Sequence, residues 1–156
     1  YLNLLNKWYK SPIKIVSHIE GTKITPSLVE NRIKELKISS RDKVYTFLMY
    51  DMDVEVVNEK LLKCKAEMLL SNPCFEIWLL LHIKDQKTAI KTDALIKELK
   101  KIAPVWKNYN KSAFTDTQQS FLKDNTDVAV IRAKDLREFQ NPSTGIYKLI
   151  EMLKKR

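Results

Sequence analysis

The pair Asp51 and Asp53 constrains the fold of this chain more than any other feature of its sequence. Both aspartates follow the apolar run at residues 44–50, which is rich in the β-branched and aromatic residues that favour strands. They therefore stand at the carboxyl end of a predicted buried strand. In an open α/β sheet, ligands bind in the crevice outside the carboxyl ends of the strands. The sequence thus places two carboxylates where such a sheet would hold a ligand.

The spacing of Asp51 and Asp53 lets both side chains reach one point, because alternate residues of an extended chain face the same way. Two carboxylates about 4 Å apart at an effective dielectric of about 20 repel by roughly 4 kcal/mol. The pair therefore needs a cation, a shared proton or open water. Mg²⁺ meets this need, since it binds one or two carboxylates and keeps several waters. The alternative is an Asx turn whose solvated aspartates only close the strand.

Strands and helices alternate in the first half of the sequence, which predicts parallel βαβ units. Alternating apolar residues indicate a strand at residues 13–19, and Pro26 after Thr25 marks the start of a helix. We therefore expect an α/β fold with a parallel sheet flanked by helices. The predicted elements are a helix at 1–9, a strand at 13–19, a helix from 26, a strand at 44–50, a helix at 54–62 and a strand at 66–70.

The second half of the sequence shows helical spacing of its apolar residues and no alternation typical of strands. We therefore expect an α/β core at residues 1–86 and a helical C-terminal extension at residues 87–156, packed on that core. The predicted helices of the extension lie at 91–102, 115–125, 127–139 and 143–155.

Glu76 and His82 fall within an otherwise apolar helix predicted at residues 74–83. We expect Pro73 to begin this helix and Ser71 or Asn72 to cap it. A charged group in a buried helix must be paired, bind a metal or shift its pKa. Both residues are therefore candidate catalytic residues. The alternatives are a helix-dipole or packing role for the acid in the first turn, and a hydrogen-bonded core role for the imidazole.

Basic residues exceed acidic ones by 28 to 19, a net charge of +9 that favours a polyanionic partner such as DNA or RNA. Lys111 and Arg132 stand among aromatic or apolar residues and are candidates for phosphate contacts, with structural pairing as the alternative. Other lysines, such as Lys97, Lys100 and Lys101, fall on a helix face, where a solvated surface is the alternative explanation.

Several classes of protein are disfavoured by composition. The sequence has two glycines, too few for a Gly-rich phosphate loop, and it contains no Walker or dinucleotide fingerprint. Cys64 and Cys74 are not in a Cys-x-x-Cys pair, which favours buried thiols in a reducing compartment over zinc or redox chemistry. No apolar stretch approaches the length of a membrane span. We therefore expect a cytoplasmic protein without a membrane partner.

Four stretches of the sequence together resemble the RloB-like family. These are prokaryotic proteins with a Toprim-like core, often encoded beside an ATPase among restriction or phage-defence genes. The resemblance implies a Toprim-like, Rossmann-type parallel sheet in which Asp51 and Asp53 hold Mg²⁺ or Mn²⁺. It also supports Glu76 and His82 as site residues, because the family retains both residue types at these places. The four stretches are Asp51-Met52-Asp53, residues 71–82, Tyr109 with Lys111, and residues 141–144.

Toprim enzymes combine the Asp-x-Asp pair with a glutamate that follows their first strand. We expect that strand and its glutamate just before Tyr1, because residues 1–5 resemble the family's next helix. Glu20 follows the second predicted strand and is no substitute. If the upstream glutamate is absent, the chemistry should be crippled.

The resemblance implies a Mg²⁺-dependent nuclease, or a related phosphoryl-transfer component, of an antiphage system of the abortive-infection or restriction-associated kind. DNA or RNA would be its substrate, and an AAA- or SMC-like ATPase its partner. The alternative is a non-catalytic partner, or a nucleotide-sensing module, of that ATPase.

Overall fold

The sheet of this protein is small and mixed. The computed structural model describes residues 1–9 and 15–155. Its strands are β1 (Phe47–Asp51), β2 (Glu67–Asn72) and β3 (Ser143–Thr144), in the order β1-β2-β3. β1 and β2 run parallel, as the sequence predicted, whereas β3 pairs antiparallel with the last two residues of β2. The α/β class is therefore confirmed, with one strand reversed.

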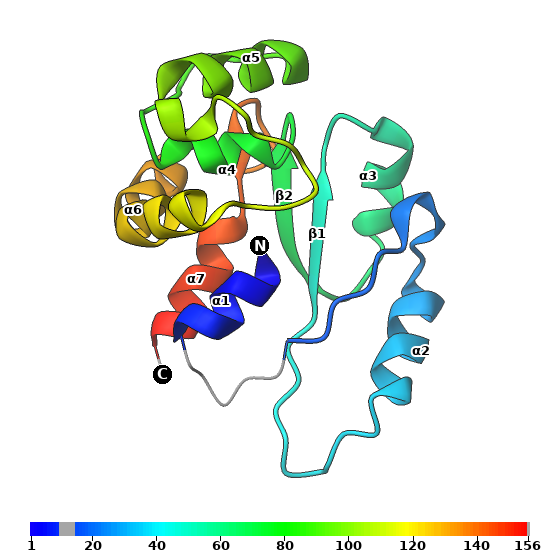
Figure 1. The fold of residues 1–156 in the computed structure, drawn as a ribbon. Coiled ribbons are helices and arrows are strands. Elements are labelled where there is room, and N and C mark those ends of the chain that lie inside the picture. The colour runs from blue at the N-terminus through cyan, green and yellow to red at the C-terminus, as the bar shows by residue number, and fades with distance from the viewer. Residues whose placement is uncertain (10–14, 156) are drawn as a thin grey trace.

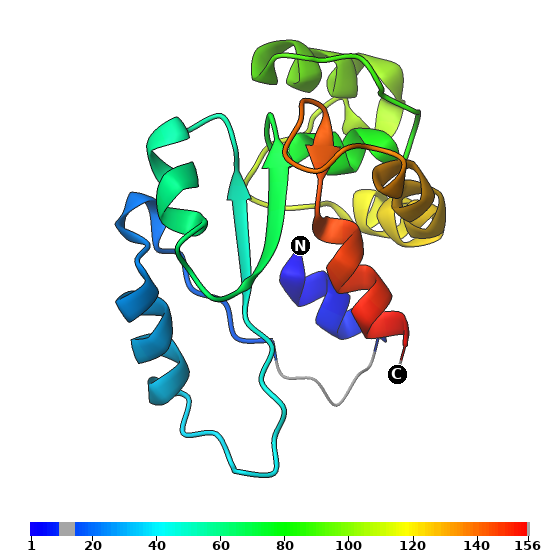
Figure 2. The same ribbon diagram turned by 180° about the vertical axis from the view of Figure 1, so that it is seen from behind.

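Helices flank the sheet on both sides. Figures 1 and 2 show α1, α4, α6 and α7 on one side and α2 and α3 on the other, with α5 near the ends of the strand arrows. The helices are α1 (Leu2–Tyr9), α2 (Pro26–Glu35), α3 (Glu55–Leu61), α4 (Glu76–Leu81), α5 (Thr92–Ile102), α6 (Asp116–Lys134) and α7 (Ile146–Lys154), and short 3-10 helices are η1 (Gly21–Lys23) and η2 (Pro104–Trp106).

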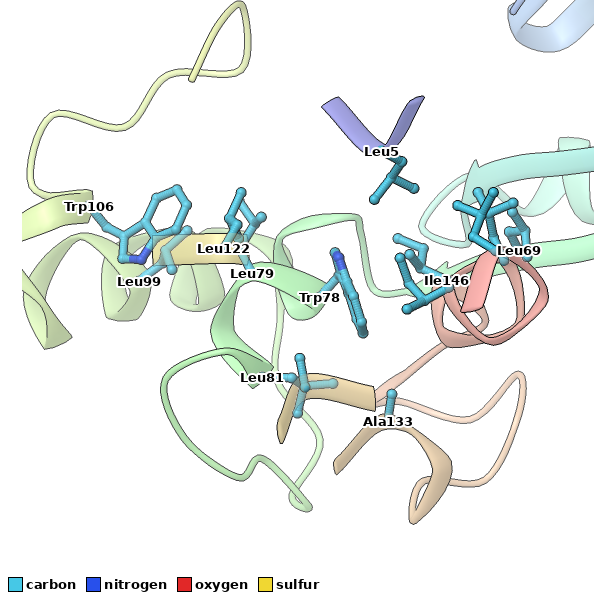
Figure 3. Close-up of a cluster of buried hydrophobic side chains, with 14 of the residues drawn as sticks. Leu5, Leu69, Trp78, Leu79, Leu81, Leu99, Trp106, Leu122, Ala133 and Ile146 are labelled. Carbon is cyan, nitrogen blue, oxygen red and sulfur yellow. The ribbon is translucent and has the colours of Figure 1, made fainter. Parts of the chain in front are cut away.

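The two faces of β2 are buried in different hydrophobic clusters. Leu69 belongs to the larger cluster, together with Leu5, Trp78 and Ile146 (Figure 3). Its neighbour Leu70 belongs to a second cluster on the side of α2 and α3. This is the alternation expected of a strand covered on both faces.

The larger cluster joins the beginning, middle and end of the chain. Leu5 of α1, Trp78 of α4 and Leu149 of α7 are all members of it, and each is at most 5% exposed. The helical segment after residue 86 therefore packs on the α/β part through a shared core. The domain boundary itself stays a prediction.

The expected strand at residues 13–19 is wrong in its described part. Residues 15–19 have no regular structure, and Ile19 is fully exposed; residues 10–14 lie outside the described residues. β1 is also shorter than predicted, because Val44 and Tyr45 precede it as exposed residues. An alternating pattern forms a strand only where a neighbouring strand supplies hydrogen bonds and one face is covered.

Three predictions for the second half are corrected. The two helices expected at 115–125 and 127–139 form one helix, α6. Residues 143–144, expected to start the last helix, form β3 instead. α4 begins at Glu76 rather than at Pro73, because Asn72 donates from its side chain to the Phe139 carbonyl (2.9 Å) and caps no helix.

Among the described residues, none of the helices combines the length and the apolar character that crossing a membrane requires.

Candidate functional site

The carboxyl ends of β1 and β2 form the edge of the sheet where the predicted carboxylates gather. Asp51, the last residue of β1, pairs in parallel register with Ser71 of β2. The Met52 amide donates to the Ser71 carbonyl (2.8 Å) and extends the pairing past the strand. Since β1 and β2 run parallel, Asp51 and the start of α4 at Glu76 lie at the same edge.

Asp51 is partly buried and held in place by the backbone before α4. Its Oδ1 accepts a hydrogen bond from the Phe75 amide (2.7 Å). Burial raises the pKa of Asp51, and the charges of Glu76 and Asp53 raise it further, although the Phe75 amide and Lys111 act in the opposite direction. A cation beside Asp51 would relieve this repulsion between acids.

Asp53 is the exposed member of the pair. It lies in the turn after β1, and its Oδ2 accepts a hydrogen bond from the Thr92 hydroxyl (3.1 Å) at the start of α5. The two aspartates thus differ in environment, one partly buried and one open to water. The sequence offered no local signal for Thr92, which is 39 residues away from Asp53.

Glu76 is the buried acid of this edge, with its side chain 1% exposed. Its Oε1 accepts from the Tyr109 hydroxyl (3.1 Å) and lies 3.2 Å from the Lys111 ammonium nitrogen. Burial alone would raise the pKa of Glu76. The neighbouring Cys74 thiol, the backbone amide at the start of α4 and Lys111 outweigh it and lower the pKa. Glu76 is therefore held as an anion.

Lys111 lies on the loop between η2 and α6, which passes the end of β1 (Figure 1). Its side chain is 62% exposed although its ammonium group contacts buried Glu76. Burial tends to lower the pKa of Lys111, but the Glu76 carboxylate reverses this and raises it. An ammonium group has three donors, so Lys111 can bind Glu76 and still present N–H groups to an anion from solvent.

His82 lies at the other end of α4. Six positions after Glu76, it stands about 9 Å further along the helix axis at about 1.5 Å per residue. Its Nδ1 donates to the Trp78 carbonyl (2.8 Å), and burial lowers the pKa of His82 to about 4. Arg132 is nearby and donates to the Leu81 carbonyl (2.7 Å). The structure thus separates His82 and Arg132 from the three carboxylates.

A model of the family described as RloB-like protein matches residues 1–153. The chain belongs to the RloB-like family. No curated protein and no solved structure matches it. The resemblance inferred from the sequence is therefore confirmed at the level of the family.

The four RloB-like stretches meet at one edge of the sheet. Asp51 of the first stretch pairs with Ser71 of the second. The Ser71 hydroxyl lies 2.9 Å from the Thr144 hydroxyl of the fourth. Glu76 of the second stretch binds the third through Lys111, as described above. Segments far apart in the sequence of this RloB-like protein thus converge on a single place.

The oxygens at this edge fit a hard divalent cation. Asp51 has Oδ1 engaged by a backbone amide, which leaves Oδ2 for a metal, and Asp53 is open to solvent. Within residues 1–9 and 15–155, no three His, Cys, Asp or Glu side chains are grouped closely enough to hold a metal ion. The residues of this RloB-like protein therefore fit Mg²⁺ or Mn²⁺ bound by two carboxylates and several waters.

Proposed function

We propose that this RloB-like protein is a Toprim-type, Mg²⁺- or Mn²⁺-dependent phosphoryl-transfer enzyme that cleaves DNA or RNA in prokaryotic antiphage defence, in the cytoplasm. The convergence of four family stretches on the Asp51 edge carries this proposal. A fold needs no such grouping of two aspartates, a buried acid and a lysine. Phosphodiester cleavage does use carboxylates that hold a divalent cation beside a cationic phosphate contact.

Each residue of the edge would have a distinct part in that chemistry. Asp51 and Asp53 would hold the divalent cation, which when bound polarises a phosphate oxygen and activates water. Lys111 would contact a phosphate oxygen with the donors that Glu76 leaves free. Glu76, buried and ionised, would act as a positioning residue that fixes Lys111 at the edge.

Cleavage assays test this proposal directly. The full-length protein is incubated with plasmid DNA, single-stranded DNA and structured RNA in Mg²⁺ or Mn²⁺, beside its Asp51→Asn and Asp53→Asn variants. Asp124→Asn, an exposed acid on α6, is the matched control. We expect metal-dependent cleavage that Asp51→Asn and Asp53→Asn abolish and the control retains. Cleavage that survives in both variants would remove the site from the chemistry.

A second candidate function is a non-catalytic or nucleotide-sensing module that binds an AAA- or SMC-like ATPase. The observation that favours it is the grouping of fewer than three metal-ligating side chains among the described residues. Co-purification with the ATPase that Asp51→Asn leaves intact, together with absence of cleavage on all three substrates, would support this function over the nuclease.

A further inference from the structure

Lysines are concentrated in the segment that leads from α5 back to the Asp51 edge. Residues 91–111 contain six lysines and two acidic residues, so they supply four of the nine net positive charges of the chain. We call five of these lysines the basic track: Lys97, Lys100, Lys101, Lys107 and Lys111. All five are exposed.

The lysines of α5 occupy the face of the helix opposite its buried side. Leu95 and Leu99 are fully buried, and Lys97, Lys100 and Lys101 follow at the helical spacing that groups them on the outer face. The helix dipole accounts for cations in the last turn of α5. It does not account for Lys97, which lies earlier, or for the lysines beyond the helix.

Acidic residues do not neutralise this outer face. The acid within α5 that lies among the lysines, Glu98, pairs instead with Lys84 (3.0 Å). Asp93 stands one turn before Lys97, but the described residues include no ion pair between them. Solvated helix faces usually alternate charges of both signs, so the basic track is not explained as such a face.

The basic track ends at the candidate site. Trp106 is fully buried and anchors η2, which fixes the position of the adjacent Lys107. Two residues later the Tyr109 hydroxyl binds Glu76, and Lys111 follows on the same carboxylate. At its other end the segment is tied to the site as well, because Thr92 at the start of α5 binds Asp53.

We propose that the basic track binds the phosphate backbone of a nucleic-acid strand and leads it to the Asp51 edge. This inference rests on the proposed function for the identity of the site, but it concerns binding and not cleavage. Lysines along a groove or face bind successive phosphates without reading sequence. An anionic membrane fits less well, because the apolar side of α5 is buried and none is left to enter lipid.

The test measures binding without chemistry. Anisotropy of labelled single-stranded DNA and RNA is titrated with the protein in EDTA, at several salt concentrations. The variant is Lys97→Gln, Lys100→Gln and Lys101→Gln together. We expect an affinity loss on the order of tenfold and a salt slope shallower by about two, from about 0.7 per lost contact on a single strand. The corresponding Lys→Arg triple should keep both.

The matched control removes three lysines elsewhere. Lys63 and Lys65 precede β2, at the edge of the sheet opposite the candidate site, and Lys37 follows α2; all three are exposed. Their joint change to Gln alters the net charge equally, and we expect it to change binding by less than about twofold at moderate salt, because screening confines such charges to a Debye length of about 10 Å.

Equal losses in both triples, or no loss in either, would overturn the proposal. Binding of polyglutamate as tight as that of the oligonucleotides would overturn it too, in favour of an acidic protein partner. Failure of the nuclease proposal has a different result: cleavage is absent while selective loss of binding in the α5 triple remains.

Discussion

The pair of Glu76 and Lys111 gives a prediction whose size and pH dependence follow from burial. Lys111→Ala removes the cation that lies 3.2 Å from Glu76 and leaves a carboxylate that is 1% exposed. Its remaining neighbours would be the Tyr109 hydroxyl and the Cys74 thiol. Breaking a fully buried ion pair costs about 3 to 5 kcal/mol, and exposed pairs contribute about 0 to 1 kcal/mol.

Because Lys111 is 62% exposed, water replaces part of the lost interaction. We therefore expect Lys111→Ala to lower the free energy of unfolding by about 1 to 2 kcal/mol at neutral pH. In the wild type the folded pKa of Glu76 is lowered, so its contribution is present above the unfolded pKa and is lost as the pH falls through the folded pKa. Without Lys111, burial raises the folded pKa, and the sign reverses.

The deficit of Lys111→Ala should therefore be largest at neutral pH and shrink as the pH falls through the raised pKa of Glu76. Urea unfolding followed by circular dichroism at several pH values from neutral to mildly acidic measures it. Lys107→Ala, on the same loop and without an ion pair in the described structure, is the control and should be near neutral. The double variant Glu76→Gln with Lys111→Ala should lose the pH dependence. A deficit that is the same at every pH would refute the reasoning.

Three further predictions concern the core and the sheet. Trp78→Ala should lower the free energy of unfolding by about 3 to 5 kcal/mol, because the ring is fully buried; a loss below about 1 kcal/mol in urea unfolding would contradict this packing. Gly145→Ala should destabilise by about 1 to 3 kcal/mol, since a Cβ would lie 2.9 Å from the Met68 carbonyl oxygen, and a raised Tm would count against it. His82 has a folded pKa of about 4, below its ordinary value, so the wild type should lose up to about 3 kcal/mol as the pH falls from about 6.5 to 4. His82→Asn should lack that part of the loss in unfolding at matched pH values.

Local signals of the sequence were enough for several elements. Thr25 before Pro26 predicted the start of α2, and the Thr25 hydroxyl accepts from the Leu28 amide (3.2 Å). The apolar run before Asp51 predicted β1 and its parallel partner. Each of these depends on residues near one another in the chain, which is where propensity and periodicity act.

Elements that depend on distant partners were predicted less well. β3 forms because Thr144 pairs with Ser71, 73 residues earlier, although the sequence around it has helical spacing. α6 continues through the point where a break was expected, and the Thr126 hydroxyl there donates to the Leu122 carbonyl (2.6 Å) inside the helix. Neither pattern alone shows which tertiary partner decides the outcome.

The candidate site divides in the same way. The position of Asp51 at a strand end followed from the sequence, as did the burial of Glu76. The contacts of Glu76 with Tyr109 and Lys111 join residues 33 and 35 positions apart, and only the fold brings them together. An aromatic and a basic residue two positions apart, within an otherwise polar loop, was the available signal.

Metal binding at the Asp51 edge is the most direct test of the account. Mn²⁺ is titrated into the full-length protein and free Mn²⁺ is measured by electron paramagnetic resonance, with Mg²⁺ as competitor, for the wild type, Asp51→Asn, Asp53→Asn and the control Asp124→Asn. The account predicts one site that Mg²⁺ displaces, weakened at least about tenfold by either of the first two changes, which each remove a charged ligand, and unaffected by the control. Equal Mn²⁺ affinity in all four proteins would contradict it.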